Sequence, residues 1–162
     1  MKIFILVLIP FMLFSNTFYI DNYAPDSGNG LINSPFNSLR QAFSISQPGD
    51  TLILRGSHSE YGQIYFEGID LPHSGYINKR ITILNYQSEV VVISISHDFK
   101  IDENYWSFTG IVFEDLKSGF SNADFSGKHN NFYNCIFRTN SINFFEQGEQ
   151  QYNLFKYCKI EN

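Results

Sequence analysis

Four basic or phenolic side chains lie close together near the end of the chain: Tyr133, Arg138, Lys156 and Lys159. Lysine and arginine neutralise carboxylates, and lysine, arginine and tyrosine can transfer protons when their surroundings adjust the pKa. These residues fall on consecutive copies of a sequence repeat and are therefore candidate ligand contacts. The alternative is that they are ordinary solvated side chains on one face of a strand.

Other side chains that bind metals do not form a recognisable motif. No HxH or HxxxH spacing occurs among the histidines, so no zinc site is expected. Asp26 and Asn29 lie beside glycines and could hold Ca²⁺, although such stretches are more common as plain turns. The histidines are His58, His73, His97 and His129.

The two cysteines, Cys135 and Cys158, occupy the same position in the segments FYNCIF (132–137) and FKYCKI (155–160). They could form a disulfide in an oxidising compartment, or they could be a buried reduced pair. No histidine or third cysteine shares their spacing, so they do not predict a metal or redox site.

These two segments belong to a repeat of apolar, variable, polar, apolar, variable and apolar residues. Three copies begin at Phe108, Phe132 and Phe155, and weaker matches towards the N-terminus fall at Ile83 and, after a longer interval, at Leu54. From Ile83 to Phe155, the first residues of successive copies are thus 23 to 25 positions apart. A period of about 23 to 25 residues is typical of one turn of a right-handed parallel β-helix, whose coils stack about 4.8 Å apart.

The repeat predicts three inward files, in which each coil contributes one side chain. Because no coil can bury its apolar side alone, stacking of the files supplies the core. The same register predicts an outward row of alternating charge. The predicted files are Phe108, Phe132 and Phe155, then Ile111, Cys135 and Cys158, then Phe113, Phe137 and Ile160, and the charged row is Glu114, Arg138 and Glu161.

One short helix is expected before the coils, at about residues 38–46. Asn37 or Ser38 can cap it, and Leu39, Ala42 and Phe43 fall on one face. Strands are expected in segments where apolar residues alternate with polar ones. No two-residue hairpin connector joins these segments, which argues against a β-sandwich, the least favoured alternative. The segments are FYI, TLILRG, GQIYFEGI, KRITILNY, EVVVISIS, NYWSFTGIVFED, HNNFYNCIFRTN and QQYNLFKYCKIEN.

The first residues predict secretion. Lys2 precedes an apolar run from Ile3 to Phe14 and then small polar residues, which together indicate a signal peptide over residues 1–17 that is cleaved near Thr17. Pro10 and the shortness of the run argue against a membrane span. Without this segment the formal charge moves from -5 to 10 - 16 = -6, so nucleic acid is not an expected partner. After cleavage of the signal peptide, no membrane partner is expected either.

The segment FYIDNYAPDSGNGLINSPFNSLRQAFSISQPGDTLILRG resembles the N-terminal start of secreted right-handed β-helix proteins of the pectate lyase-like superfamily, which include chondroitinase B-like and alginate lyases. The segment HSGYINKRITILNY is similar to their next feature, a Ser-Gly loop before an Ile-Thr-Ile strand. The resemblance implies that residues 18–49 form a strand, a loop and a capping helix, and that residues 50–162 form the coils. Such lyases have many more coils, so we expect an N-terminal fragment that is incomplete at its C-terminal end.

The resemblance also implies a substrate class, acidic polysaccharide, and a reaction, β-elimination. That reaction needs a cation, Ca²⁺ or arginine, to neutralise the carboxylate, a base to remove the C5 proton and an acid for the leaving oxygen. Ca²⁺ is implied by resemblance alone, and the catalytic residues are expected on later coils, outside this chain. Substrate contacts are expected at Tyr133, Arg138, Lys156 and Lys159. The competing interpretation is a non-catalytic surface or adhesion scaffold.

Overall fold

The computed structural model describes most of the chain after the predicted signal peptide. Residues 1–14 of that peptide, and His97, lie outside the described part, so the cleavage prediction is not tested by it. The described residues are 15–59, 61–65, 71–95, 100–116, 123–138, 142–143 and 152–161.

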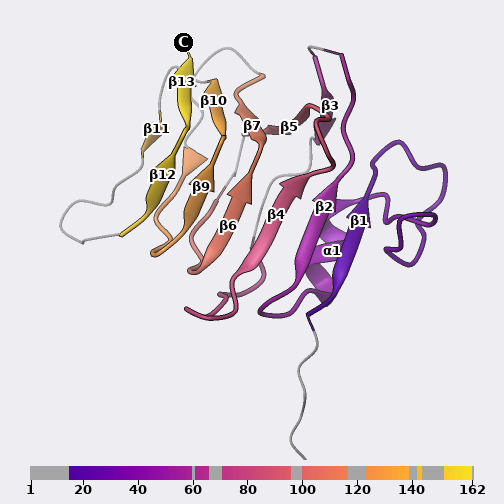
Figure 1. Ribbon diagram of the computed structural model, residues 1–162, viewed down its shortest axis with the longest axis horizontal. Coiled ribbons are helices and arrows are strands. Elements are labelled where there is room, and N and C mark those ends of the chain that lie inside the picture. The colour runs from indigo at the N-terminus through magenta and orange to yellow at the C-terminus, as the bar shows by residue number, and fades with distance from the viewer. Residues whose placement is uncertain are drawn as a thin grey trace, which may run out of the picture.

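The strands form three parallel sheets wound into a β-helix (Figure 1). The first, six-stranded sheet has the order β1-β2-β4-β6-β9-β12, and the second, five-stranded sheet has the order β13-β10-β7-β5-β3. All pairings between named strands are parallel, which rules out the hairpin-built β-sandwich. The first sheet contains β1 (Thr17–Ile20), β2 (Thr51–Leu54), β4 (Ile81–Asn85), β6 (Trp106–Thr109), β9 (Asn131–Tyr133) and β12 (Leu154–Lys156), and the second contains β3 (Gln63–Tyr65), β5 (Val91–Ser94), β7 (Ile111–Glu114), β10 (Ile136–Arg138) and β13 (Lys159–Glu161).

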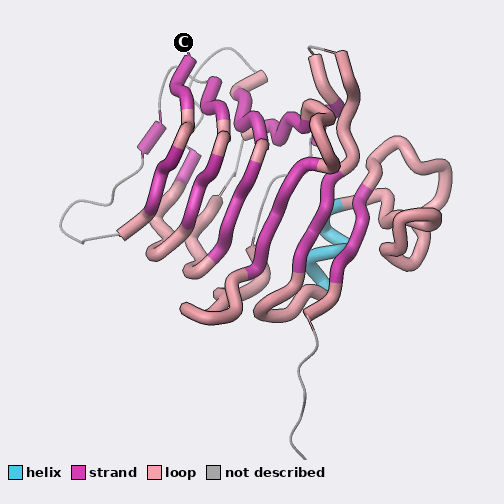
Figure 2. The backbone as a smooth tube through the Cα atoms, in the orientation of Figure 1, coloured by secondary structure: helices cyan, strands magenta, loops and turns pink. Residues whose placement is uncertain are grey.

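Each coil contributes one strand to each of these two sheets, so five coils are present among the described residues, as predicted. Figure 2 shows the strands of successive coils lying side by side. The third sheet was not predicted. It pairs β8 (Ala123–Asp124) with β11 (Ile142–Asn143), and two-residue strands are too short to show a period in the sequence.

The strand register confirms the predicted inward files. Phe132 pairs with both Phe108 and Phe155, and the same register continued by one residue from β10 places Cys135 beside Cys158. The prediction for the earliest coil was wrong, because Ile83 pairs with Leu52 and not with Leu54. The Leu52 side chain faces inward one pleat away from Leu54, and the loops between β2 and β4 make this coil longer than the later ones.

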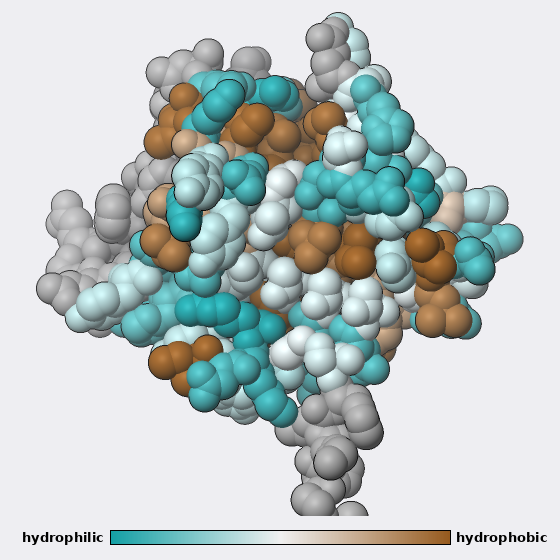
Figure 3. Space-filling model, viewed as in Figure 1, coloured by the Kyte–Doolittle hydropathy of each residue, from teal (hydrophilic) through white to brown (hydrophobic). Residues whose placement is uncertain are grey.

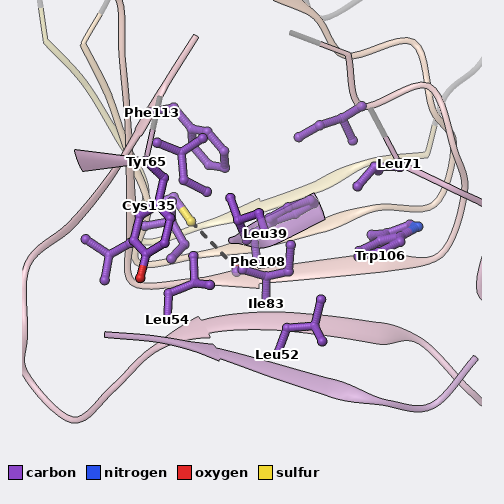
Figure 4. Close-up of a cluster of buried hydrophobic side chains, with 14 of the residues drawn as sticks. Leu39, Leu52, Leu54, Tyr65, Leu71, Ile83, Trp106, Phe108, Phe113 and Cys135 are labelled. Atoms are coloured by element: carbon purple, nitrogen blue, oxygen red, sulfur yellow. Dashed lines mark hydrogen bonds between the residues drawn. The ribbon is translucent and has the colours of Figure 1, made fainter. Parts of the chain in front are cut away.

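Phenylalanine rings stack along the inward files and fill the core. The Phe132 ring lies 5.1 Å from the Phe108 ring and 4.8 Å from the Phe155 ring, with planes within 7° of parallel. Phe113 and Phe137 stack in the same way at 5.1 Å. Figure 4 shows this region with Cys135, whose thiol donates a hydrogen bond to the Phe108 carbonyl oxygen at 3.6 Å. Parallel stacking follows from the register, since each ring repeats one strand spacing above the last.

Helix α1 (Leu39–Ile45) begins where the sequence predicted and packs against the core. Ser38 is its N-cap, and the Ser38 hydroxyl accepts a hydrogen bond from the Gln41 N–H at 3.2 Å. Leu39, Ala42 and Phe43 are buried, so the predicted apolar face is confirmed. The helix lies behind β1 and β2 in Figure 1, on the core side of the first sheet. It therefore leaves the outer face of that sheet exposed.

The chain turns from the first sheet to the second at one residue with a positive φ angle. Gly110 (φ 69°), Asn134 (φ 51°) and Tyr157 (φ 59°) occupy this bend on three successive coils. A Cβ atom on Gly110 would collide with the Asn85 Oδ1 atom, so glycine is needed there for space as well as for conformation. The bend separates side chains that are only a few residues apart in sequence onto different faces.

Candidate functional site

The outer face of the six-stranded sheet has a row of small polar side chains along its centre. Because side chains alternate across a strand, the residue before each inward file member points outward. These outward residues pair with one another from coil to coil, and Figure 3 shows a face that is largely hydrophilic or neutral. We call this the polar row, which consists of Thr17, Thr51, Thr82, Ser107 and Asn131.

Two of the four predicted contacts lie together on the same face. Tyr133 and Lys156 are register partners on β9 and β12, two residues along the strand from the polar-row position. Neither the Tyr133 hydroxyl nor the Lys156 ammonium is held by a carboxylate among the described residues. Lys156 is exposed, and its Nζ atom lies 5.1 Å from the centre of the Tyr157 ring. A phenol and an ammonium thus lie on neighbouring coils of the outer face.

The other two predicted contacts lie beyond the bend, on the five-stranded sheet. Arg138 is on β10 and Lys159 is on β13. Arg138 donates to Glu114 at 3.3 Å and to Glu161 at 3.0 Å, which confirms the predicted charged row. Hydrogen bonds to Glu161 and then to Glu114 raise the pKa of Arg138. The structure therefore places the four predicted residues in two groups, and the charge of Arg138 is already compensated.

A second row on the first sheet was not predicted. Arg80, Tyr105, His129 and Tyr152 stand two residues before the polar-row position on four successive coils. The Tyr105 and His129 rings stack at 4.9 Å with planes 1° apart, and His129 and Tyr152 stack at 5.2 Å with planes 4° apart. The Arg80 guanidinium lies 5.5 Å from the centre of the Tyr105 ring. We call these four residues the aromatic row.

The sequence contains a signal for the aromatic row. Each member lies three residues before an inward file member, so Tyr105, His129 and Tyr152 share the spacing of the repeat itself. All three have positive φ angles, of 60°, 58° and 52°. Non-glycine residues rarely take this conformation, and here it repeats at the turn that enters each first-sheet strand.

Two asparagines next to the aromatic row, one buried and one half-buried, hold these turns in place. Asn130 is fully buried, and its Oδ1 atom accepts the Trp106 N–H at 2.8 Å while its Nδ2 donates to the Glu103 carbonyl oxygen at 2.9 Å. One coil later, the Asn153 Oδ1 accepts the Asn130 N–H at 2.7 Å and its Nδ2 donates to the Gly127 carbonyl oxygen at 2.8 Å. The repeated bonds fix the position from which the neighbouring aromatic-row side chains project.

The cysteines are neighbours in an inward file, as predicted, and both are free thiols. The hydrogen bond between them, followed by burial, raises the pKa of Cys135, and the same bond lowers the pKa of Cys158. In its protonated form, the Cys158 thiol donates to the Phe132 carbonyl oxygen at 3.3 Å. The structure thus has the reduced pair and not the disulfide.

Other candidate metal-binding residues serve local structure. Among the described residues, no group of three His, Cys, Asp or Glu side chains is placed to hold a metal ion. The His73 Nε2 atom lies 2.8 Å from the Ser46 carbonyl oxygen. The Asn29 Oδ1 atom accepts the Leu31 N–H at 3.2 Å, as in a plain turn. In the described part of the chain, we find no helix with the length and apolarity of a membrane span.

Several solved structures share this fold. A rhamnogalacturonan lyase superimposes with a TM-score of 0.62 and 12% identity, and covers 90% of this chain. The pectate lyase Pel9A has a TM-score of 0.56 and 19% identity over 89% of the chain, and the GH136 lacto-N-biosidase from Eubacterium ramulus has 0.56 and 14% over 90%. The chain spans 51%, 47% and 31% of these structures, respectively.

The sequence comparisons point the same way. An uncharacterised protein of Bacillus subtilis (strain 168), YwoF, is 34% identical over 76 residues, which are 47% of this chain and 15% of YwoF. Residues 18–160 match the family described as "Pel9A-like, right handed beta helix region", which confirms the fold and the resemblance predicted from the sequence. The chain therefore belongs to the Pel9A-like family of right-handed β-helix proteins.

Proposed function

We propose that this chain is the front portion of a secreted β-helix protein that binds an acidic polysaccharide along the outer face of the six-stranded sheet. The observation that carries the proposal is the pairing of Tyr133 with Lys156 on consecutive coils, beside the polar row. A sugar chain lying along the helix axis would meet equivalent polar groups about every 4.8 Å. The names of two similar structures, rhamnogalacturonan lyase and pectate lyase, support polysaccharide as the ligand class.

In this proposal the whole protein is a lyase, and the residues that remove the C5 proton lie outside residues 1–162. The partial coverage of both lyases, 51% and 47%, is consistent with this division. The salt-bridged Arg138 is not expected to neutralise a substrate carboxylate, because Glu114 and Glu161 already compensate its charge. We therefore expect this chain to bind the glycan without cleaving it.

Binding is tested by calorimetric titration of the purified chain with polygalacturonate, alginate and chondroitin sulfate, and with dextran as a neutral control. We expect binding to at least one acidic glycan, weakened by salt because exposed charges are screened. Lys156→Gln should weaken glycan binding about threefold, which corresponds to the free energy of a single exposed ion pair. Lys100→Gln is the matched control, since Lys100 is exposed but lies beside β8, away from this face. If none of the acidic glycans binds, the proposal is wrong.

The alternative function is a non-catalytic scaffold. It is favoured by contacts within the protein itself, because the stacked phenylalanines of the core and the outward charged row Glu114–Arg138–Glu161 stabilise the coils without any ligand. The same titration separates the two functions. A chain that unfolds cooperatively but binds no glycan would support the scaffold.

Secretion is part of the proposal and rests on the predicted signal peptide. The Asn16 N–H donates to Asp50 Oδ1 at 2.7 Å, and the Thr51 N–H donates to the Asn16 carbonyl oxygen at 2.8 Å. A cleavage just before Ser15 would keep these bonds, whereas cleavage after Thr17 would remove part of β1. N-terminal sequencing of the exported protein would identify the bond, and retention of residues 1–14 would contradict the prediction.

A further inference from the structure

We infer that the aromatic row is the part of the outer face that recognises the carboxylate groups of the glycan. This inference rests on the proposed function and makes it more specific. The row consists of Arg80, Tyr105, His129 and Tyr152, and its members contact one another in that order. It runs along the helix axis, beside the polar row.

The stacking geometry decides which atoms the row offers. Because the ring planes are within 4° of parallel and follow the axis, the ring faces cover one another and the edges remain for a ligand. The edge of tyrosine carries a hydroxyl, and the edge of histidine carries ring nitrogens. Neither the Tyr105 hydroxyl nor the His129 ring nitrogens form a hydrogen bond within the described part of the chain. These two neighbouring coils thus each offer a polar group, at a spacing similar to the length of a sugar ring.

Arg80 supplies the charge that selects an anion. Its guanidinium donates to the carbonyl oxygens of Trp106 (3.4 Å) and His129, so the side chain is held in place before any ligand arrives. Arg80 is half-buried, yet it has no carboxylate partner among the described residues. By contrast, Arg55 pairs with Glu89 at 2.9 Å, and Arg138 pairs with two glutamates. An immobilised arginine without an acidic partner is suited to bind a carboxylate.

The polar row lies within reach of a glycan that contacts the aromatic row. The two rows are separated by two residues along each strand, or about 7 Å. A sugar whose carboxylate meets Arg80 or His129 could therefore place ring hydroxyls against Ser107 and Asn131. Neutral sugars would gain only the second set of contacts, so the row favours acidic sugars over neutral ones.

The competing explanation is that the stack only stabilises the turns. Replacing Tyr105 and His129 together by phenylalanine separates the two roles, because aromatic rings remain in the stack and the polar edges are lost. We expect the double variant to bind polygalacturonate about tenfold more weakly than the unmodified chain, since two hydrogen bonds are removed. Its melting temperature should stay within about 3 °C, because the stacking of rings is preserved.

The control is Tyr23→Phe with His58→Phe, which makes the same two replacements at exposed positions outside the row. Affinity should be unchanged in this control. If the Tyr105 and His129 double variant binds as tightly as the unmodified chain while Lys156→Gln binds less well, the inference is wrong and the proposed function stands. If the unmodified chain binds no acidic glycan, both are wrong.

Discussion

Replacing Asn130 by alanine should destabilise the protein far more than an average substitution. Asn130 is fully buried, and two of its side-chain bonds satisfy main-chain groups of the preceding coil, the Trp106 N–H and the Glu103 carbonyl oxygen. Alanine leaves both groups unpaired. Trp106 is itself fully buried, so water cannot replace the bond to its N–H.

The expected loss follows from these two bonds. An unsatisfied buried polar group costs about 1 to 3 kcal/mol, and the Glu103 carbonyl oxygen is at the lower end because that residue is half-exposed. We therefore expect the free energy of unfolding to fall by about 3 kcal/mol. For a chain of this size the melting temperature should fall by roughly 6 to 12 °C.

The matched control is Asn153→Ala. Asn153 forms the same two kinds of bond one coil later, with the Asn130 N–H and the Gly127 carbonyl oxygen, but it is more exposed. Water can replace part of the hydrogen bonding that is lost there, so we expect the free energy of unfolding to decrease by only about 1 kcal/mol. Both variants can be followed by urea unfolding with the fluorescence of Trp106, the single tryptophan, as the signal. An Asn130→Ala loss below about 0.5 kcal/mol, the range of an ordinary surface substitution, would refute the reasoning, as would a larger loss for Asn153→Ala.

Three further predictions concern the bend, the core and pH. Gly110→Ala should lower the free energy of unfolding by about 2 kcal/mol, because its φ is positive and a Cβ would collide with Asn85 Oδ1; urea unfolding with an unchanged midpoint would contradict this. Phe132→Ala should lower the free energy of unfolding by about 3 to 5 kcal/mol, because the fully buried Phe132 ring is stacked on both sides. A much smaller loss measured by calorimetry would contradict this packing. The hydrogen bond from Arg55 lowers the pKa of Glu89, so the stability from this pair is complete above about pH 4.3 and is lost as the pH falls through the lower folded-state pKa. Thermal unfolding of Glu89→Gln should therefore depend less on pH in this acidic range, and an unaltered pH dependence would rule out this role.

The later coils could be predicted because their repeat has a nearly constant length. Phe108, Phe132 and Phe155 are each followed by the same short bend, so spacing in the sequence becomes vertical alignment in the structure. The first coils contain longer connections between strands, and the constant spacing fails there. For this reason the sequence spacing predicts Leu54, whereas Leu52 is the residue that pairs with Ile83.

The candidate site was predicted only in part, for a geometric reason. Tyr133 and Lys156 share one position of the repeat and therefore lie on one face. Arg138 and Lys159 follow the bend at Asn134 or Tyr157, and that bend turns the chain onto another sheet, which a linear spacing does not reveal. The aromatic row could have been found by extending the repeat three residues towards the N-terminus.

The face that binds the glycan can be identified directly by an NMR titration of the ¹⁵N-labelled chain with oligogalacturonate. Binding along the outer face of the first sheet predicts that the amide signals of Ser107, Asn131 and Tyr133 shift with saturation, while those of β10 and β13 stay in place. Shifts confined to the five-stranded sheet, or the absence of shifts at saturating oligosaccharide, would contradict the account.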